Sequence, residues 1–485
     1  MNQTTIFDML YPKYKIAKPI RLIELFAGYG SQALALKYLG VKFEHWKICE
    51  WAVKSIQAYK DIHFTDDTRN YSEVASKEEI QEMLLKWGIS SNYNEPMTRE
   101  QINRLSEEQL RTIFNNISAT NNLVNIQDVK GDDLAIVNKD EYDYILTYSF
   151  PCQDLSLAGK GKGMADTSTR SGMLWEVERI LNELKELNQL PQILLMENVP
   201  QVHGIDNVEH FNKWQLALEN MGYKNYFQDL IATDYGIPQT RNRCFMISIL
   251  GDYSYTFPKP IPLNLKLKDM LENNVEEKYY LKVLFRSDKM LDYFLGTNQK
   301  ESKFPRGERF LQSLEQTNEK NIATTITTNA GNRPTDNFIR VKNATKKGYL
   351  EATDGDGIDI SSRMEHHRGT VQKGKAQTLT TQCDRGVVIG TYQYAKSDKF
   401  MQGRDRLQLG KDTSDTLQTT PKEGIVNSNL RIRKLTPLEC FRLMGVKDED
   451  YYKVAKNQSN SSLYHLAGDS IVVNVLMAIF KELIK

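Results

Sequence analysis

The chain of 485 residues has a formal net charge of +1 and is 40% hydrophobic and 26% charged, an ordinary composition for a globular protein. Its length predicts two domains. No apolar run approaches the 18 residues of a membrane span, and the first residues lack the basic-then-apolar pattern of a secretory signal. The five cysteines are scattered without metal-ligand spacing. We therefore expect free thiols, a reducing cytoplasmic setting and no metal site.

Residues 20–50 have the pattern of a strand, a turn, a helix and a second strand. IRLIELF is a short aliphatic run, AGYG supplies the turn, and SQALALKYLG is helical with Gly40 at its end. FEHWKICE then resumes an extended pattern that ends in Glu50. Further apolar runs, YDYILTYSF, QILLMENV and RCFMISIL, alternate with helical stretches. This alternation predicts an α/β fold with a mostly parallel sheet and helices on both faces.

Residues 66–127 interrupt this alternation with an acidic, helical segment. SKEEIQEMLLKWG has helical spacing, and MTREQINRLSEEQLRTIFNN holds two capping boxes, Thr98 with Gln101 and Ser106 with Gln109. We expect an insertion within the first domain, residues 1–255. The sequence assigns this insertion no role.

From about residue 256 the sequence becomes Thr-rich and favours strands. A weak repeat of a β-branched run and a turn signal, at 325–332, 378–389 and 416–426, predicts hairpins. Residues 256–454 hold 34 Lys and Arg against 26 Asp and Glu. Chance unevenness is the simpler explanation of this charge, but clustered Lys and Arg also indicate a polyanionic partner.

The C-terminal part of the chain predicts two helices. Thr436 suits a helix cap, Pro437 the first helical position, and Glu439 completes a capping box. LAGDSIVVNVLMAIFKELIK is strongly apolar and predicts a closing helix, so we expect residues 455–485 to return to the first domain.

Ligands of an open parallel sheet bind at the carboxyl ends of its strands, so the residues there are candidate site residues. Glycine in AGYG allows a ligand to approach the backbone closely. An acidic residue about 20 positions onward, here Glu50, is placed to hold ribose hydroxyls, and Trp51 offers a stacking face for adenine. The third glycine of the dinucleotide fingerprint is absent. A nucleoside-type cofactor therefore fits better than a pyrophosphate.

Cys152 is the strongest candidate for a nucleophile. Most free cysteines are small buried hydrophobic residues, but Cys152 follows a proline at a strand end and begins a glycine-rich loop. The motifs ENV and QTRNR are expected to bring a carboxyl group and two guanidinium groups near the thiol, and arginine lowers a thiol pKa. No histidine occupies an equivalent strand end, which counts against a Cys-His hydrolase.

The motifs FAGYG, PCQ, ENV, QTRNR, RKLTPLECFRLMG and AGDSIVVNV resemble, in this order, those of DNA cytosine-5 methyltransferases of the bacterial or phage modification type. The match spans residues 21–250 and 430–485, and the combination of PCQ, ENV and QxRxR is far more specific than any one of them. The resemblance implies a Rossmann-like, S-adenosylmethionine-dependent methyltransferase fold with a β-rich target-recognition domain at 256–454.

The resemblance also implies transfer of a methyl group from S-adenosylmethionine to carbon 5 of a flipped-out cytosine in duplex DNA. Cys152 would add to ring carbon 6, and Glu197 would hydrogen-bond ring nitrogen 3. Arg243 would hold the carbonyl oxygen, with Arg241 in support. Asp128 is the candidate for the adenine amine contact. The implied cofactor-binding residues are Phe26, Gly28, Gly30, Glu50, Trp51, Asp128, Pro151, Leu174 and Ser470.

The glycine-rich run after Cys152 is expected to close over the flipped base as a lid, with an ordinary solvated loop as the alternative. The predicted DNA contacts in this run are Gln153, Ser156, Lys160 and Lys162. We expect double-stranded DNA as the partner, a monomer, no membrane contact and a location in the cytoplasm of a bacterial or phage-infected cell. A cognate restriction endonuclease is a candidate partner.

One position departs from the family pattern, and three other functions stay open. Asp469 stands where the last motif usually has asparagine, and its charge either weakens cofactor binding slightly or faces solvent. A tRNA methyltransferase of the same family would keep every motif, but that branch has a short recognition region. An inactive DNA-binding relative would normally lose Cys152 or Glu197. A nucleotide-cofactor oxidoreductase would leave PCQ unexplained.

Overall fold

The computed structural model describes residues 11–151, 171–279, 339–345, 348–353, 355–359, 368–381, 385–394 and 426–484. The chain forms two compact units. The first comprises Met1–Glu272, Gln377–Cys383 and Thr436–Lys485, and the second comprises Asn273–Ala376 and Asp384–Leu435. The second unit therefore begins later than the predicted boundary at 256 and ends before the predicted boundary at 454.

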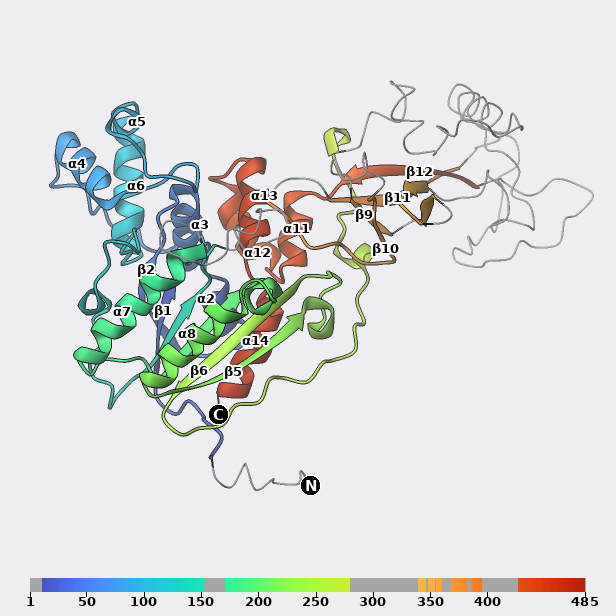
Figure 1. Ribbon diagram of the computed structural model, residues 1–485. Coiled ribbons are helices and arrows are strands. Elements are labelled where there is room, and N and C mark those ends of the chain that lie inside the picture. The colour runs from blue at the N-terminus through green and yellow to red at the C-terminus, as the bar shows by residue number, and fades with distance from the viewer. Residues whose placement is uncertain are drawn as a thin grey trace, which may run out of the picture. The chain divides into compact units, whose positions relative to one another are not determined.

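A six-stranded sheet with the order β2-β1-β3-β4-β6-β5 forms the centre of the first unit (Figure 1). Its strands are β1 (Ile20–Leu25), β2 (Phe43–Cys49), β3 (Asp143–Tyr148), β4 (Ile193–Asn198), β5 (Tyr223–Ile231) and β6 (Asn242–Leu250). The strands β1 to β4 run parallel, and β6 runs antiparallel to both β4 and β5. The predicted α/β fold with a mostly parallel sheet is confirmed. Strand β5 was not predicted, because its centre is exposed and lacks a continuous apolar run.

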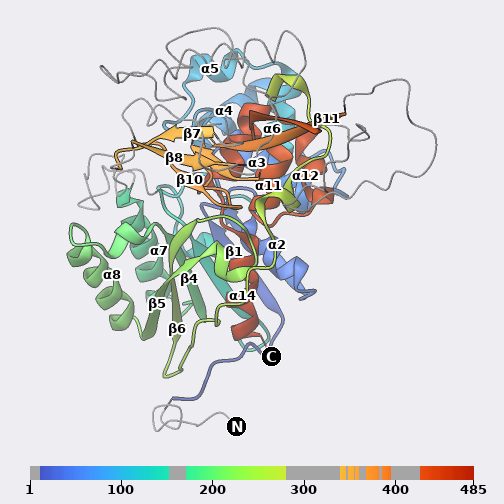
Figure 2. The same ribbon diagram turned by 90° about the vertical axis from the view of Figure 1, so that its right-hand side faces the viewer.

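Helices cover both faces of this sheet (Figure 2). One face carries α7 (Leu174–Glu186) and α8 (Val208–Asn220), and the other carries α2 (Ser31–Tyr38) and α14 (Val473–Leu483). The apolar side of α7 is buried at helical spacing, at Val177, Ile180, Leu181 and Leu184. These side chains join the strand residues in one hydrophobic core. Further helices are α3 (Val53–His63), α11 (Pro437–Leu443) and α12 (Asp448–Ala455).

The predicted closing helix is two helices, which is a correction to the sequence analysis. α13 (Asn460–Asp469) ends at Ser470, and α14 begins at Val473. Ser470 has an extended backbone (ψ 171°) that interrupts the helix. The stretch Asn460–Leu483 is apolar and long enough to meet a length-and-hydropathy test for a membrane span, with a mean hydropathy of 1.6, but 67% of it is buried inside the fold. Burial of this kind is that of a core helix.

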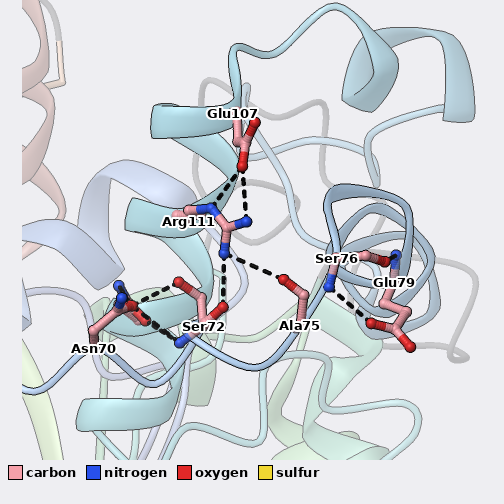
Figure 3. Close-up of polar contacts among 8 residues, drawn as sticks. Asn70, Ser72, Ala75, Ser76, Glu79, Glu107 and Arg111 are labelled. Carbon is pink, nitrogen blue, oxygen red and sulfur yellow. Dashed lines mark hydrogen bonds and ion pairs between the residues drawn. The ribbon is translucent and has the colours of Figure 1, made fainter.

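The insertion forms three helices, α4 (Lys77–Trp87), α5 (Arg99–Asn103) and α6 (Glu107–Ala119). Both predicted capping boxes, at Thr98 and Ser106, are confirmed, and Ser76 forms a third with Glu79. Figure 3 shows how Arg111 of α6 ties this segment together. Its guanidinium group donates to the carbonyl oxygen of Ser72 at 2.6 Å and to Glu107 at 2.7 Å.

The described part of the second unit is built from short antiparallel strands. They are β7 (Ile339–Lys342), β8 (Tyr349–Ala352), β9 (Gly357–Asp359), β10 (Val371–Gln372), β11 (Arg385–Tyr394) and β12 (Val426–Lys434). β7 pairs with β8, and the other four form a sheet in the order β10-β9-β11-β12. The long pair β11–β12 runs in register from Gly386↔Lys434 to Tyr394↔Val426. The predicted run at 325–332 and residues 416–425 of the third run lie outside the described residues.

Candidate functional site

A pocket lies at the carboxyl end of β1, the edge at which ligands of a parallel sheet bind. Its wall combines the β1–α2 turn, the end of β3 and the end of α13. The residues that line it are Phe26, Ala27, Gly28, Ser31, Gln32, Ser55, Ser149, His465, Leu466, Asp469, Ser470 and Ile471. The pocket therefore contains three of the predicted cofactor-binding residues: Phe26, Gly28 and Ser470.

The turn that begins this pocket has an unusual backbone. Phe26 has a φ of 59°, a left-handed conformation that costs a bulky residue about 1–2 kcal/mol. Its N–H donates to the carbonyl oxygen of Cys49 at 2.8 Å, which fixes the turn against the end of β2. Strain of this kind is concentrated at ligand-binding sites, where the surrounding structure holds it in place.

Glu50 holds the same turn from the neighbouring strand. Its Oε2 accepts a hydrogen bond from the N–H of Gly28 at 2.9 Å, and its Oε1 accepts one from the N–H of Ala52 at 2.8 Å. Burial raises the pKa of Glu50 to about 7, against the lowering effect of these two N–H groups. A carboxylate has about four lone-pair sites, so Glu50 can accept further hydrogen bonds from a ligand.

Gly30 is not among the residues that line this pocket, and its predicted contact with a cofactor stays a prediction. It precedes α2 with a φ of 80°, and a Cβ atom at this position would collide with the side chains of His63 and Tyr59. Gly30 is therefore required by close packing of α2 against α3. Only Gly28 of the two predicted glycines lies on the wall of the pocket.

Besides Gly30, five predicted cofactor-binding residues are not part of the lining of this pocket: Glu50, Trp51, Asp128, Pro151 and Leu174. Trp51 is partly buried and packs against the core of the insertion. Asp128 is exposed, and its Oδ2 accepts from Nδ2 of Asn125 at 2.8 Å. Leu174 is fully buried in the main core, and Pro151 ends a described segment next to the buried Phe150. Their proposed contacts with a cofactor stay predictions.

Glu197 and Arg243 meet at the same edge of the sheet. Nε of Arg243 lies 3.1 Å from Oε1 of Glu197, and the two side chains are only 16% and 9% exposed. This meeting depends on the antiparallel direction of β6, whose first residues lie beside the end of β4 in the register Asn198↔Cys244. Burial raises the pKa of Glu197, while Arg243 and then Arg241 oppose this shift.

The remaining polar residues of QTRNR bind the segment 377–383, which belongs to the first unit. The side chain of Gln239 accepts from the N–H of Leu379 at 3.2 Å and donates to the carbonyl oxygen of Leu443 at 2.7 Å. Nη1 of Arg241 donates to the carbonyl oxygen of Leu379 at 3.3 Å. Arg241 thus has a supporting position, and this segment crosses the site as an additional part of its frame.

Several pocket residues were missed by the sequence analysis. Ser31 and Gln32 begin α2 directly after the glycine turn, and this position was a signal that could have identified them. His465 lies one helical turn before Asp469, so helical spacing could have placed both on one face of α13. Ser55 and Ser149 carried no sequence signal of this kind.

The predicted nucleophile and DNA contacts lie outside the described residues: Cys152, Gln153, Ser156, Lys160 and Lys162. The sequence predicted no metal site. Among the described residues, His203, Asp229 and Cys244 bring possible ligand atoms within 4.8 Å of one another. Nε2 of His203 lies 2.9 Å from Oδ1 of Asp229. None of these three residues lines the pocket.

The chain is similar in sequence to known methyltransferases. The chain is 30% identical over 469 residues to the type II methyltransferase M2.ScrFI of Lactococcus lactis subsp. cremoris, covering 96% of this chain and 99% of that protein. It is 38% identical to the orphan methyltransferase M.SssI of Spiroplasma monobiae, covering 56% and 69% of the two chains. The crystal structure of S. pombe Dnmt2 methyltransferase aligns over 96% of this chain and 98% of its own, with 15% identity and a TM-score of 0.46. This structural likeness is too low to support an argument.

The family model for C-5 cytosine-specific DNA methylase matches residues 105–485, most of the chain. It includes the predicted motifs PCQ, ENV, QTRNR and AGDSIVVNV. The match and the relative M2.ScrFI together confirm the predicted family and enzyme class, and the predicted resemblance to enzymes of the modification type. The chain belongs to the C-5 cytosine-specific DNA methylase family, and it is a DNA (cytosine-5-)-methyltransferase.

Proposed function

We propose that this enzyme transfers a methyl group from S-adenosylmethionine to carbon 5 of a cytosine that has been flipped out of duplex DNA. The observation that carries the proposal is the buried pair of Glu197 and Arg243 at 3.1 Å. The pair lies at the sheet edge from which β3 runs toward Cys152. A carboxyl group and a guanidinium group side by side match the nitrogen and carbonyl oxygen on one edge of cytosine.

The pocket at the β1–α2 turn fits S-adenosylmethionine by its chemistry. Phe26 supplies an aromatic surface, Ser31, Gln32 and Ser55 supply hydrogen-bonding groups, and Glu50 stands behind Gly28. When bound, S-adenosylmethionine supplies an electrophilic methyl group.

The chain's own residues would activate the cytosine. Carbon 5 is a weak nucleophile, and addition of the Cys152 thiolate to carbon 6 makes it enamine-like. The electron pair released by this addition is stabilised at nitrogen 3, where Glu197 would share a proton. Because burial raises the pKa of Glu197, its carboxyl group is better able to hold that proton near neutral pH. Once carbon 5 has accepted a methyl group, the proton at nitrogen 3 returns to Glu197. Loss of the carbon 5 proton to solvent then expels the thiolate and restores the free enzyme.

Arg243 would orient both the carboxyl group of Glu197 and the cytosine ring. Its Nε binds Glu197, and the rest of its guanidinium group is proposed to hold the carbonyl oxygen at carbon 2 of cytosine. Its Nη1 donates to the carbonyl oxygen of Asn242 at 2.7 Å, which limits the rotation of the side chain. The fixed, planar fork of arginine suits such a shared role better than lysine would.

Duplex DNA is the proposed substrate, and the residues 256–454 are proposed as its target-recognition domain. Their excess of Lys and Arg, 34 against 26 Asp and Glu, supports binding of a phosphate backbone. Carbon 5 and carbon 6 are stacked inside a duplex, so the cytosine must leave the stack before a thiolate reaches it. The proposed lid is the glycine-rich run that contains Ser156, Lys160 and Lys162.

Transfer of a radiolabelled methyl group to duplex DNA and to tRNA, at equal concentrations of cytosine, tests which nucleic acid is the substrate. We expect label on duplex DNA containing many sequence contexts, and loss of this label with Cys152→Ser and with Glu197→Gln. Label on tRNA alone would contradict the DNA proposal and favour the tRNA-methylating branch. Binding of S-adenosylmethionine without transfer to either nucleic acid would favour an inactive DNA-binding relative.

A further inference from the structure

The insertion is firmly joined to the strand that carries Glu50. Side-chain Oδ1 of Asn122 accepts from the N–H of Glu50 at 3.0 Å, and its Nδ2 donates to the carbonyl oxygen of Glu50 at 2.9 Å. The N–H of Leu123 donates to the carbonyl oxygen of Ile48 at 2.8 Å. The C-terminal end of the insertion thus continues the edge of the sheet beside β2.

A second connection joins the middle of the insertion to the residues after Glu50. The N–H of Ser90 donates to the carbonyl oxygen of Trp51 at 2.8 Å, and the N–H of Val53 donates to the carbonyl oxygen of Ser90 at 2.9 Å. Trp51, Val53 and Ile56 also pack into the hydrophobic core of the insertion. The loop between α4 and α5, which contains Ser90, is therefore held close to the start of α3, which carries the pocket residue Ser55.

Tyr93 extends from this loop toward the pocket. Its backbone has a φ of 64°, which is a strained conformation for an aromatic residue. Its ring stacks on the ring of His465, with centroids 3.8 Å apart and an angle of 14° between the planes. Burial raises the pKa of Tyr93, and the carboxylates of Glu50 and Asp469 add to this shift.

His465 connects this stack to the wall of the pocket. Both His465 and Asp469 line the pocket, one helical turn apart on α13. Nδ1 of His465 lies 3.1 Å from Oδ2 of Asp469, whose side chain is 52% exposed. Rotation of the imidazole ring would break this contact between His465 and Asp469 on the wall of the pocket.

We propose that Tyr93 is a positioning residue for the cofactor, through which the insertion sets the affinity of the pocket. The ring of Tyr93 fixes the plane of His465, and His465 in turn orients Asp469 on the wall. The proposal rests on the proposed function, in which this pocket binds S-adenosylmethionine. It gives the insertion a role, because Asn122 and Tyr93 hold two sides of the same cofactor site.

Isothermal titration of the full-length enzyme with S-adenosylhomocysteine, the demethylated product, tests this proposal. We expect Tyr93→Ala to raise the Kd by about three- to tenfold, the size of one lost aromatic contact. Tyr93→Phe keeps the ring and should bind within about twofold of the wild type. Tyr452→Ala, which removes a 54% exposed tyrosine of α12, serves as the matched control and should leave the Kd unchanged.

A double-mutant cycle with His465→Ala separates positioning from general destabilisation. If Tyr93 acts through His465, the double variant should bind no more weakly than His465→Ala alone. In the methylation assay, Tyr93→Ala should raise the KM for S-adenosylmethionine and leave kcat near the wild-type value. Additive losses of affinity, or a fall in kcat with KM unchanged, would overturn the proposal.

The outcomes also distinguish this proposal from the proposed function. A wild-type protein that binds neither S-adenosylmethionine nor its product overturns the proposed function and this proposal together. A wild-type protein that binds its cofactor as tightly as Tyr93→Ala does overturns this proposal alone. If Tyr93→Ala fails to fold, as judged by circular dichroism, the Kd values of His465→Ala and Tyr93→Phe decide instead. Weaker binding by His465→Ala with wild-type binding by Tyr93→Phe supports the proposal. Wild-type binding by both variants contradicts it.

Discussion

Loss of the arginine partner should leave a buried carboxylate at the centre of the site. Arg243→Met keeps the volume of the side chain and removes the cation 3.1 Å from Glu197, which is 9% exposed. Breaking a buried ion pair from one side costs about 3–5 kcal/mol. Because Arg241 also lowers the pKa of Glu197, part of the charge compensation survives, and we expect a loss near the lower end, about 3 kcal/mol.

Equilibrium urea unfolding followed by tryptophan fluorescence measures this loss of stability in the first unit, which contains Glu197 and Arg243. All five tryptophans belong to the first unit: Trp46, Trp51, Trp87, Trp175 and Trp214. The double variant Glu197→Gln with Arg243→Met has no buried charge to leave unpaired. We therefore expect it to be more stable than Arg243→Met alone at pH 8, by at least about 1 kcal/mol. A double variant that shows the simple sum of the two single losses would refute the reasoning.

Three further predictions follow from the buried groups and the turn around the pocket. Burial raises the pKa values of Glu24 and Glu50 from 4.5 to about 7, so the folded protein keeps protons that the unfolded chain releases between these values. The free energy of unfolding should therefore fall as the pH rises through this window, and Glu24→Gln should remove about 3 kcal/mol of that fall. Urea unfolding at pH 5 and pH 8 measures the fall, and an equal fall for the wild type and Glu24→Gln would contradict this. Gly30→Ala should lower the stability by about 1–3 kcal/mol through strain and collision, whereas Gly28→Ala, with no atom within 4 Å of its added Cβ, should cost less; equal losses of Tm would contradict the assignment of Gly30 to packing. Asp469→Asn should tighten binding of S-adenosylhomocysteine by about two- to fivefold, since it removes a carboxylate from the pocket wall, and calorimetry that shows equal affinity would rule out a repulsive effect.

The sequence was most informative where local patterns determine structure. The short aliphatic runs predicted β1 to β4 and β6, and the capping boxes at Thr98, Ser106 and Thr436 predicted three helix starts correctly. Strand β5 was missed because its centre is exposed, and an exposed strand leaves no apolar run to detect. The break between α13 and α14 at Ser470 was missed because no proline or glycine stands between Ser470 and the start of α14 at Val473.

The site was predictable in its residue types and less so in its geometry. The order of PCQ, ENV and QTRNR predicted that Glu197 and Arg243 belong together, but their contact requires β6 to run antiparallel, which no local pattern reveals. Gly30 carried the same signal as Gly28, yet it serves packing against His63. The contact of Tyr93 with His465 joins residues 372 positions apart, and only the tertiary fold brings such residues together.

The roles proposed for the two units make different demands on the sequence. Catalytic motifs are short because each strand end contributes one or two fixed side chains to the site. Recognition of a DNA sequence depends instead on which side chains of a β-rich surface reach base edges, and this depends on the docked geometry. The charge of residues 256–454 therefore supports a polyanionic partner without naming a base-reading residue.

Mass-spectrometric analysis of nucleosides tests the central claim most directly. Duplex DNA is incubated with S-adenosylmethionine and the enzyme, beside a Cys152→Ser control that binds S-adenosylhomocysteine with wild-type affinity. The account predicts 5-methylcytosine from the wild type alone, with no other methylated nucleoside. Equal 5-methylcytosine from Cys152→Ser, or a methyl group on any atom other than carbon 5 of cytosine, would contradict covalent catalysis by Cys152.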